Sequence, residues 1–227
     1  MSATPSAEHY AGDAGRVYHE KKRGIPDAAL PWVAQHRAKK IAPYVASSDV
    51  VFEYGVGWGW NLAALKCRRK IGFDVSEMLR DKVAGQGIEF ISSTNQLVTS
   101  SADVIICHHT LEHIIDPTRA LAEMKTSLKR DSKLLLFVPF ERESRYTRFD
   151  PAEPNHHLYS WNAQTLGNLV QQCGFKVLEA HVAPFGYDRF SAVWSHRFKL
   201  GAFGFRLIRS IAHIAKPAFE VCVVCTH

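Results

Sequence analysis

The sequence predicts an α/β protein with a seven-stranded, mostly parallel sheet that is covered by helices on both faces. Short apolar runs alternate with amphipathic segments, which is the pattern of strands joined by crossover helices. Glycine, proline and helix-capping residues separate these segments. The chain has 227 residues, of which 46% are hydrophobic and 22% charged, so it is long enough to bury one well-formed core.

Seven segments have the length and apolar character of buried strands. They are residues 50–53, 70–74, 88–91, 103–107, 133–138, 175–180 and 219–225. Helices are expected over residues 30–44, 61–69, 77–84, 117–128 and 162–173. Ser76 and Asp116 are suitable N-caps, Pro117 suits the first turn of its helix, and Gly174 ends the last of these helices.

We expect a single domain overall, with an N-terminal helical extension at residues 1–45 and a late insertion at residues 184–217. The second half of the insertion, residues 205–216, forms an amphipathic pattern with apolar residues on one face. These apolar residues are Leu207, Ile208, Ile211 and Ile214. Such a helix suits a substrate lid, a peripheral contact with an anionic membrane surface, or packing on the sheet.

The composition argues against several classes of protein. Five cysteines, an odd number, disfavour a disulfide framework, and the lone C-x-x-C at 222–225 lies in an apolar run rather than in a zinc site. The polar N-terminal residues lack the apolar core of a signal peptide, and no apolar run is long enough to span a membrane, so the expected location is cytoplasmic. A net charge of +6 is accounted for by a basic, solvated surface.

Residues 51–60 read V-F-E-Y-G-V-G-W-G-W, an apolar strand followed by glycine at every second position. Glycines directly after a strand permit a tight turn and bring backbone close to a ligand. Glu53 ends the strand, where a carboxylate repels a pyrophosphate and attracts a cation. Asp74 ends the next strand and suits the hydroxyls of a ribose. The pattern therefore predicts a site for a positively charged nucleoside.

Four segments in order resemble the class I S-adenosylmethionine-dependent methyltransferases, most clearly the small-molecule group that includes the quinone-biosynthesis enzymes. They read E-Y-G-V-G-W-G, G-F-D-V-S, A-D-V-I-I-C-H-H-T-L-E-H-I-I-D-P and L-L-L-F-V-P-F-E, and H-H-L-Y-S-W followed by C-G-F extends the likeness to residue 175. The resemblance implies a Rossmann-like fold with residues 46–227 as the methyltransferase domain. It implies S-adenosylmethionine as cofactor and a small-molecule methyl acceptor, most simply a hydroxyl on a lipid-linked, quinone or sugar compound.

The resemblance also implies the residues that hold the cofactor. Glu53 would hold the amino-acid end of the cofactor and Asp74 the ribose. The loop beneath the methionine part and the ribose would consist of Gly55, Gly57 and Gly59.

Other positions take roles from the same resemblance. Val75 and Met78 would flank the adenine, and Ser93 would contact the adenine amine, because residues 92–95 read S-S-T-N and contain no acid. Tyr18 would cap the methionine end from an N-terminal extension that folds over the cofactor. His108, just past the fourth strand, would border the reacting centre.

Methyl transfer to a hydroxyl also needs a base, and histidine has a suitable pKa near neutral pH. The candidates are His108 and His109 after the fourth strand, and His157 together with its neighbour His156 in the loop after the fifth. Residues 109–113 also fit the H-x-x-E-H pattern of a zinc peptidase group. That pattern belongs inside a helix, whereas here it begins at a strand end, so we expect no metal.

Three other functions remain open on the sequence. A nicotinamide-dependent oxidoreductase is disfavoured by Glu53 and by G-x-G-x-G in place of G-x-G-x-x-G. A nucleic-acid methyltransferase is unlikely on the sequence, since residues 107–110 read C-H-H-T and not the Asn/Asp-Pro-Pro-aromatic segment common in base-modifying enzymes. A non-catalytic S-adenosylmethionine-binding module would keep the cofactor site without a base. The sequence leaves the oligomeric state open.

Overall fold

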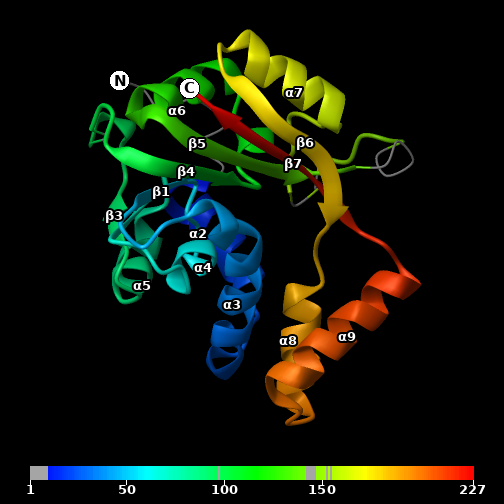
Figure 1. The fold of residues 1–227 in the computed structure, drawn as a ribbon. Coiled ribbons are helices and arrows are strands. Elements are labelled where there is room, and N and C mark those ends of the chain that lie inside the picture. Colours follow the sequence, from blue (N-terminus) through cyan, green and yellow to red (C-terminus); the bar gives the residue numbers. More distant parts are fainter. Residues whose placement is uncertain (1–9, 97, 142–146, 152, 154) are drawn as a thin grey trace.

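The computed structural model describes residues 10–96, 98–141, 147–151, 153 and 155–227. Its centre is a seven-stranded sheet with the strand order β3-β2-β1-β4-β5-β7-β6 (Figure 1). The strands are β1 (Val50–Tyr54), β2 (Arg69–Phe73), β3 (Glu89–Ile91), β4 (Ala102–His108), β5 (Leu128–Pro139), β6 (Lys176–Pro184) and β7 (Phe219–Thr226). Strand β7 runs antiparallel to β5 and β6, and the pairs from β3 to β5 are parallel. The predicted seven-stranded, mostly parallel sheet is confirmed.

Helices cover both faces of this sheet, as predicted (Figure 1). In the described residues they are α2 (Gly12–Arg23), α3 (Leu30–Ile41), α4 (Trp60–Ala63), α5 (Arg80–Ala84), α6 (Pro117–Ser127), α7 (Ala163–Gln172), α8 (Asp188–Arg197) and α9 (Gly201–Ala215). Helices α6 and α7 lie on one face, and α3, α4 and α5 lie on the other. Short 3₁₀ turns connect several of them, including η3 (Glu77–Leu79) and η5 (Leu111–His113).

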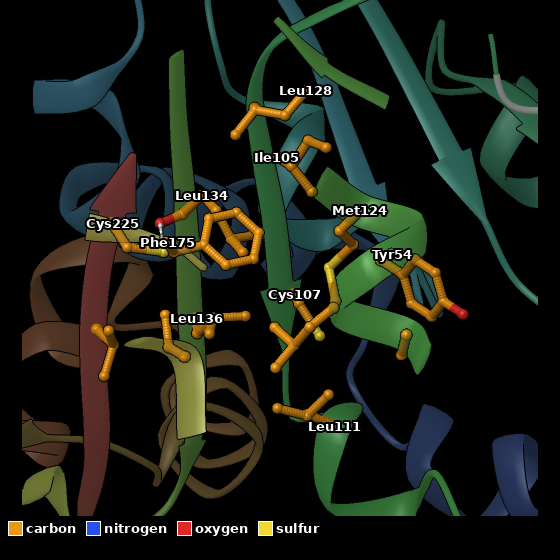
Figure 2. Packing of buried hydrophobic residues seen from close by; sticks show 14 of the residues in the cluster. Tyr54, Ile105, Cys107, Leu111, Met124, Leu128, Leu134, Leu136, Phe175 and Cys225 are labelled. Atoms are coloured by element: carbon orange, nitrogen blue, oxygen red, sulfur yellow. Dashed lines mark hydrogen bonds between the residues drawn. The ribbon is translucent and has the colours of Figure 1, made fainter. Parts of the chain in front are cut away.

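The core is divided by the sheet because successive side chains of a strand point to opposite faces. Ile105 and Cys107 of β4 pack with α6 and α7, together with Met124 and Leu134, and Figure 2 shows this cluster at close range. The residues between them, Val104 and Ile106, pack on the other face with α3, α4 and α5. Strands buried on both faces explain why these segments read as continuous apolar runs.

Local capping agrees with one prediction and corrects another. Asp116 accepts the backbone N–H of Arg119 at 3.0 Å and so caps α6, as its position before a proline predicts. Ser76 makes no side-chain cap bond to the turn that follows it. Its backbone N–H instead donates to Oδ1 of Asp74 at 3.0 Å. The aspartate therefore organises this turn.

Two elements differ in length from their predictions. The helix expected over residues 61–69 ends at Ala63, because the N–H groups of Arg68 and Arg69 both donate to the carbonyl of Asp49 and start the pairing of β2 beside β1. The strand expected over residues 133–138 begins earlier, at Leu128, and includes an irregular stretch where the register against β4 shifts and Asp131 has φ 60°.

The late insertion forms a helical hairpin of α8 and α9, which extends away from the sheet beside α3 (Figure 1). The expectation that the second helix could pack on the sheet is therefore wrong. A small cluster joins the hairpin to the N-terminal segment through Val33, Ala192 and Phe205. Asp188 adds two ion pairs, to Arg37 at 2.9 Å and to Arg209 at 3.1 Å.

The structure also bears on the expectations about the cysteines and about membrane-spanning segments. All five cysteines are free, and Cys222 and Cys225 are buried in β7 as the apolar reading of C-x-x-C predicts. Among the helices that the structure describes, none has both the length and the apolar character needed to cross a bilayer.

Candidate functional site

A cavity of about 450 Å³ opens at the carboxyl ends of β1, β2 and β4. The parallel strands place the glycine loop after β1, Asp74 after β2 and the histidines after β4 around one space. Helix α2 supplies a wall from the N-terminal extension, and Phe185 adds one from the start of the insertion. The lining residues include Tyr10, Tyr18, Gly55, Gly57, Trp58, Asn61, Asp74, Val75, His108, His109, Thr110 and His113.

The three predicted glycines take different parts in this loop, although all have positive φ. A side chain at Gly55 would collide with Thr110, whose Oγ1 lies 2.2 Å from the added Cβ position. A side chain at Gly57 would meet no atom within 4 Å, since this glycine borders the open cavity. Gly59 lies off the cavity wall, where a Cβ would be 2.9 Å from Cδ1 of Ile88. Gly57 is therefore the glycine that leaves room for a ligand.

Asp74 lines the cavity and fixes the glycine loop. Its Oδ2 accepts the N–H of Gly57 at 2.9 Å, and its Oδ1 accepts that of Ser76 at 3.0 Å. Burial raises the pKa of this carboxyl to about 6, and the backbone hydrogen bonds oppose the rise. The position suits the ribose contact expected from the sequence.

Glu53 is fully buried and is not among the residues that line the cavity. Asn61 lies between: its Nδ2 donates to Oε1 of Glu53 at 2.5 Å, and Asn61 itself borders the cavity. Burial raises the pKa of Glu53 to about 8, against the hydrogen bond from Asn61. Oδ1 of Asn61 is buried without a hydrogen-bond partner among the described residues. Asn61 therefore stands between the cavity and Glu53.

The residues expected around the adenine are only partly brought together. Val75 lines the cavity. Met78 packs against the apolar cluster beneath α5, and Ser93 accepts the N–H of Asn95 at 3.3 Å, both outside the cavity lining. Tyr18 does lie on the wall, with the ring of Tyr10 packed edge-on at 4.9 Å.

A buried cluster of charged and histidine side chains borders the cavity through His108 and His109. The rings of His108 and His109 are stacked with centroids 4.5 Å apart. Nζ of Lys40, from α3, lies 2.6 Å from Oε1 of Glu220 and 2.8 Å from Nε2 of His108. Nε2 of His109 lies 3.1 Å from Oε2 of Glu220. We call these four residues the Glu220 cluster.

The hydrogen bonds of His108 and His109 show which ring nitrogen of each can accept a proton. A lysine ammonium only donates, so Nε2 of His108 accepts from Lys40 and its lone pair is occupied. Glu220 accepts from both Lys40 and His109, so Nε2 of His109 carries the proton. Nδ1 of His109 is then the nitrogen with a lone pair, on a ring that borders the cavity. The pattern makes His109 the better proton acceptor.

The pKa values in this cluster follow from burial and from these contacts. Burial lowers the pKa of His109 to about 4, although Glu220 opposes the change. Burial, with the Lys40 charge second, lowers the pKa of His108 well below its usual value. Burial alone would raise the pKa of Glu220, but its contacts with His108 and His109 and the Lys40 charge hold it well below its usual range. The histidines are therefore neutral near pH 7.

The third predicted histidine, His157, lies away from this cluster. Its Nδ1 is 2.8 Å from Oε1 of Glu141, and its ring centroid is 4.9 Å from that of His113. The neighbouring His156 donates its backbone N–H to Oε2 of Glu153. The structure thus separates the candidate bases into two groups.

Comparison with known proteins agrees with this geometry. A family model described as a methyltransferase domain matches residues 29–180, which is more than half of the chain. The chain belongs to this family of methyltransferase domains. The methyltransferase expected from the sequence is confirmed, with S-adenosylmethionine as its expected cofactor. No curated protein sequence matches the methyltransferase.

Several solved structures have a fold similar to that of this chain. An S-adenosylmethionine-dependent methyltransferase of Thermotoga maritima has a TM-score of 0.65 at 18% identity, covering 97% of this chain and 99% of its own. A methyltransferase of Bacillus halodurans has a TM-score of 0.58 at 16% identity, with 84% and 97% covered. A phosphoethanolamine N-methyltransferase of Haemonchus contortus, solved with phosphomonomethylethanolamine and S-adenosylhomocysteine, has a TM-score of 0.58 at 11% identity, covering 85% of this chain and 52% of its own.

Sequence reasoning missed Lys40, Asn61 and Glu220. Glu220 had a usable signal, since it is a lone acid at the start of an apolar strand, and a buried charge needs a partner. Asn61 follows the glycine loop directly but has no distinctive pattern. Lys40 belongs to a helix with several basic residues, and only the packing of α3 against β7 singles it out.

Proposed function

We propose that this methyltransferase transfers a methyl group from S-adenosylmethionine to a hydroxyl of a small molecule, with His109 as general base. The single observation that carries the proposal is the contact between His109 and Glu220, which orients the ring and leaves Nδ1 as a proton acceptor at the cavity. A base held by a buried carboxylate is the arrangement that hydroxyl activation needs.

The residues present fit the cofactor. Gly57 leaves open space where any side chain would project, and Oδ1 of Asn61 is a buried acceptor at the wall, suited to an ammonium group. Asp74 suits the ribose, Val75 the adenine, and Tyr18 the methionine end. When bound, S-adenosylmethionine supplies a methyl group already activated by the sulfonium charge. Glu53 supports the ammonium site indirectly, through Asn61.

The chain's own part in the reaction is alignment and proton removal. Nδ1 of His109 would take the proton of the acceptor hydroxyl, while S-adenosylmethionine would supply the methyl group to that oxygen and leave as S-adenosylhomocysteine. Glu220 stabilises the imidazolium that results, at 3.1 Å from Nε2. Holding the reactants in line contributes on the order of 7–11 kcal/mol at best. A positioned base adds about 10²- to 10⁴-fold.

The lining of the cavity supports an acceptor with an aromatic or otherwise apolar body. Aromatic rings contribute much of the wall, namely Tyr10, Tyr18, Trp58, Trp60 and Phe185. Planar apolar ligands stack well on such rings. A phenol of the quinone type, the finer class suggested by the sequence, is the acceptor we favour.

The α8–α9 hairpin supports access to such an acceptor at an anionic membrane surface. Residues of α9 at helical spacing are exposed on one face, namely Phe203, Leu207, Ile211 and Ile214. Arg206 on the same helix and Lys216 directly after it are also exposed. Apolar residues bordered by basic ones suit the interface of an anionic bilayer.

The test is acceptor-dependent formation of S-adenosylhomocysteine with a panel of phenols, catechols and aliphatic alcohols. We expect turnover with a hydroxyl acceptor and a loss of about 10²- to 10⁴-fold in kcat for His109→Gln. His181→Gln, at an exposed residue of β6, is the matched control. Cofactor binding without turnover on any acceptor would favour the non-catalytic module instead.

A further inference from the structure

A second group of metal-ligating side chains lies beside the cofactor cavity. Glu112, His113 and His157 each offer one ligand atom, and these three atoms lie within 4.8 Å of one another. Glu112 and His113 belong to the η5 turn and are both buried, whereas His157 comes from the loop before α7. His113 and His157, which are 44 residues apart in the sequence, thus lie close together. The backbone agrees, because the N–H groups of Leu158 and Tyr159 both donate to the carbonyl of Glu112.

The surrounding hydrogen bonds indicate which ring nitrogens carry the protons. Nδ1 of His157 lies 2.8 Å from Oε1 of Glu141, a pure acceptor when ionised, so Nδ1 carries the proton and Nε2 the lone pair. Nδ1 of His113 lies 2.8 Å from the hydroxyl of Tyr10, which also lies 3.0 Å from the carbonyl of Asn155 and 3.4 Å from that of His156. When the tyrosine donates to one of these carbonyls, Nδ1 of His113 donates to the hydroxyl and its Nε2 has the lone pair.

The distance between Nε2 of His113 and Oε1 of Glu112 is 3.7 Å, too long for a hydrogen bond. Two ligands about 2.1 Å from a common tetrahedral ion are about 3.4 Å apart, so this spacing is close to that of two neighbouring ligands. Histidine ligands of metals characteristically donate their other ring N–H to a carboxylate or another acceptor. His157 with Glu141 has this arrangement, and the hydroxyl of Tyr10 lies within hydrogen-bond distance of the other nitrogen of His113.

We propose that Glu112, His113 and His157 bind one divalent transition-metal ion at the wall of the cavity. Two imidazoles and one carboxylate suit Zn²⁺, Mn²⁺ or Fe²⁺ better than Mg²⁺ or Ca²⁺, which prefer oxygen ligands. Three protein ligands leave coordination positions open for a further ligand. This departs from the absence of metal expected from the sequence, where the pattern at residues 109–113 was considered only as a helical motif.

His108, His109 and Glu220 also come close enough to share an ion. That place already holds a cation, because Nζ of Lys40 lies 2.6 Å from Glu220 and 2.8 Å from His108. The fold therefore separates His109 and His113, which the H-x-x-E-H pattern would pair. His109 belongs to the Glu220 cluster, and His113 belongs to the proposed metal site.

A role of the metal in methyl transfer would extend the proposed function, and this role, unlike metal binding itself, rests on that function. His113 and His109 both line this cavity, so an acceptor bound in it would share one space with both residues. A metal-bound hydroxyl has a lowered pKa and gives up its proton to a base more readily. An ion that takes more than four ligands would accept both oxygens of a catechol, so such acceptors would be favoured over isolated hydroxyls.

Metal binding is tested directly on the full chain, independently of activity. We titrate the chelator-treated protein with MnCl₂, and separately with ZnCl₂, by calorimetry and by electron paramagnetic resonance for Mn²⁺. We expect one site per chain, weakened at least tenfold in Glu112→Gln and in His157→Ala. His156→Asn is the matched control, because His156 is adjacent but outside the group, and asparagine tolerates its φ of 52°.

A parallel titration with S-adenosylhomocysteine separates this proposal from the proposed function. All three variants should retain cofactor binding within about threefold, which also shows that they are folded. Absence of a metal site in the parent protein, or equal metal binding in Glu112→Gln and His157→Ala, would overturn the metal site. If the parent protein binds metal but chelation leaves the rate of methyl transfer unchanged, the metal site stands and the proposed role of the metal with the acceptor is overturned.

Discussion

Nε2 of His109 lies 3.1 Å from Oε2 of Glu220, although the two residues are 111 positions apart in the sequence. The contact joins the end of β4 to the start of β7, the one antiparallel strand of the sheet. It gives the ring a fixed tautomer and a nearby negative charge. It thereby decides which of two adjacent histidines can accept a proton at the cavity.

The pH profile should report His109. Burial holds its pKa near 4, so the neutral base is fully present at pH 6–8 and is lost only as pH falls through about 4. We expect kcat/KM to be flat near neutral pH and to decline in acid, measured by initial rates at constant ionic strength. An apparent pKa near the ordinary histidine value of 6.5 would argue that a different, more exposed histidine is the base.

Substitution of the glycines should separate ligand binding from folding. Gly57→Ala meets no protein atom, so it should cost about 1–2 kcal/mol from positive φ while strongly weakening cofactor binding. Gly55→Ala collides with Thr110 and should destabilise the fold more. Urea unfolding and titration with S-adenosylhomocysteine measure the two effects. Equal cofactor affinity in Gly57→Ala and the parent would place the ligand elsewhere.

Glu53 should make stability depend on pH in the unusual direction for an acid. Its pKa rises from the ordinary 4.5 to about 8 because it is buried, so the folded state retains a proton that the unfolded state has lost. Stability from this group is complete below pH 4.5 and declines as pH rises to about 8. Glu53→Gln should remove that decline, seen as a flatter Tm between pH 5 and 8 relative to the parent.

The same variant tests the ammonium site. Since Asn61 donates to Glu53, Glu53→Gln should weaken binding of S-adenosylmethionine, and Asn61→Ala should weaken it at least as much. Asn95→Ala, outside the cavity lining, is the control. Unchanged affinity in both variants would contradict a cation site at this end of the cavity.

The hairpin should bind anionic vesicles through α9. Ile211 and Ile214 are exposed, and replacing both with serine removes apolar area without changing charge. We expect flotation of the parent with phosphatidylglycerol vesicles and loss of flotation in the double variant, with folding checked by circular dichroism. Leu178→Ser, at an exposed position of β6, is the matched control. Failure of the parent to float would show that the apolar face has another use.

Much of the fold could be predicted because parallel strands buried on both faces leave an uninterrupted apolar signature. The strands at β1 and β4, the cap at Asp116 and the glycines after β1 are all consequences of local chemistry. Asp74 could be placed for the same reason, since it follows directly from the end of a strand. The end of helix α4 and the start of β5 were predicted wrongly, because pairing with a neighbouring strand fixed both positions.

The site could be predicted only where it depends on one segment. Met78 and Ser93 follow the right strands but face other surroundings, since loop direction is set by packing. Lys40 and Glu220 carry no motif and meet through a helix and a strand 180 positions apart. Their signal is the energetic requirement that a buried charge be paired, which a sequence does not locate.

The sequence by itself determined the sheet, the glycine loop, Asp74 and membership among methyltransferases, because each depends on the backbone and its nearest neighbours. The tertiary structure alone decided that Glu53 stands behind Asn61, that Glu220 orients the ring of His109, and that His113 lies beside His157 instead of His109. Those outcomes depend on which distant segments share a buried space. There, desolvation and pairing of charges fix protonation and direction, and no local pattern encodes them.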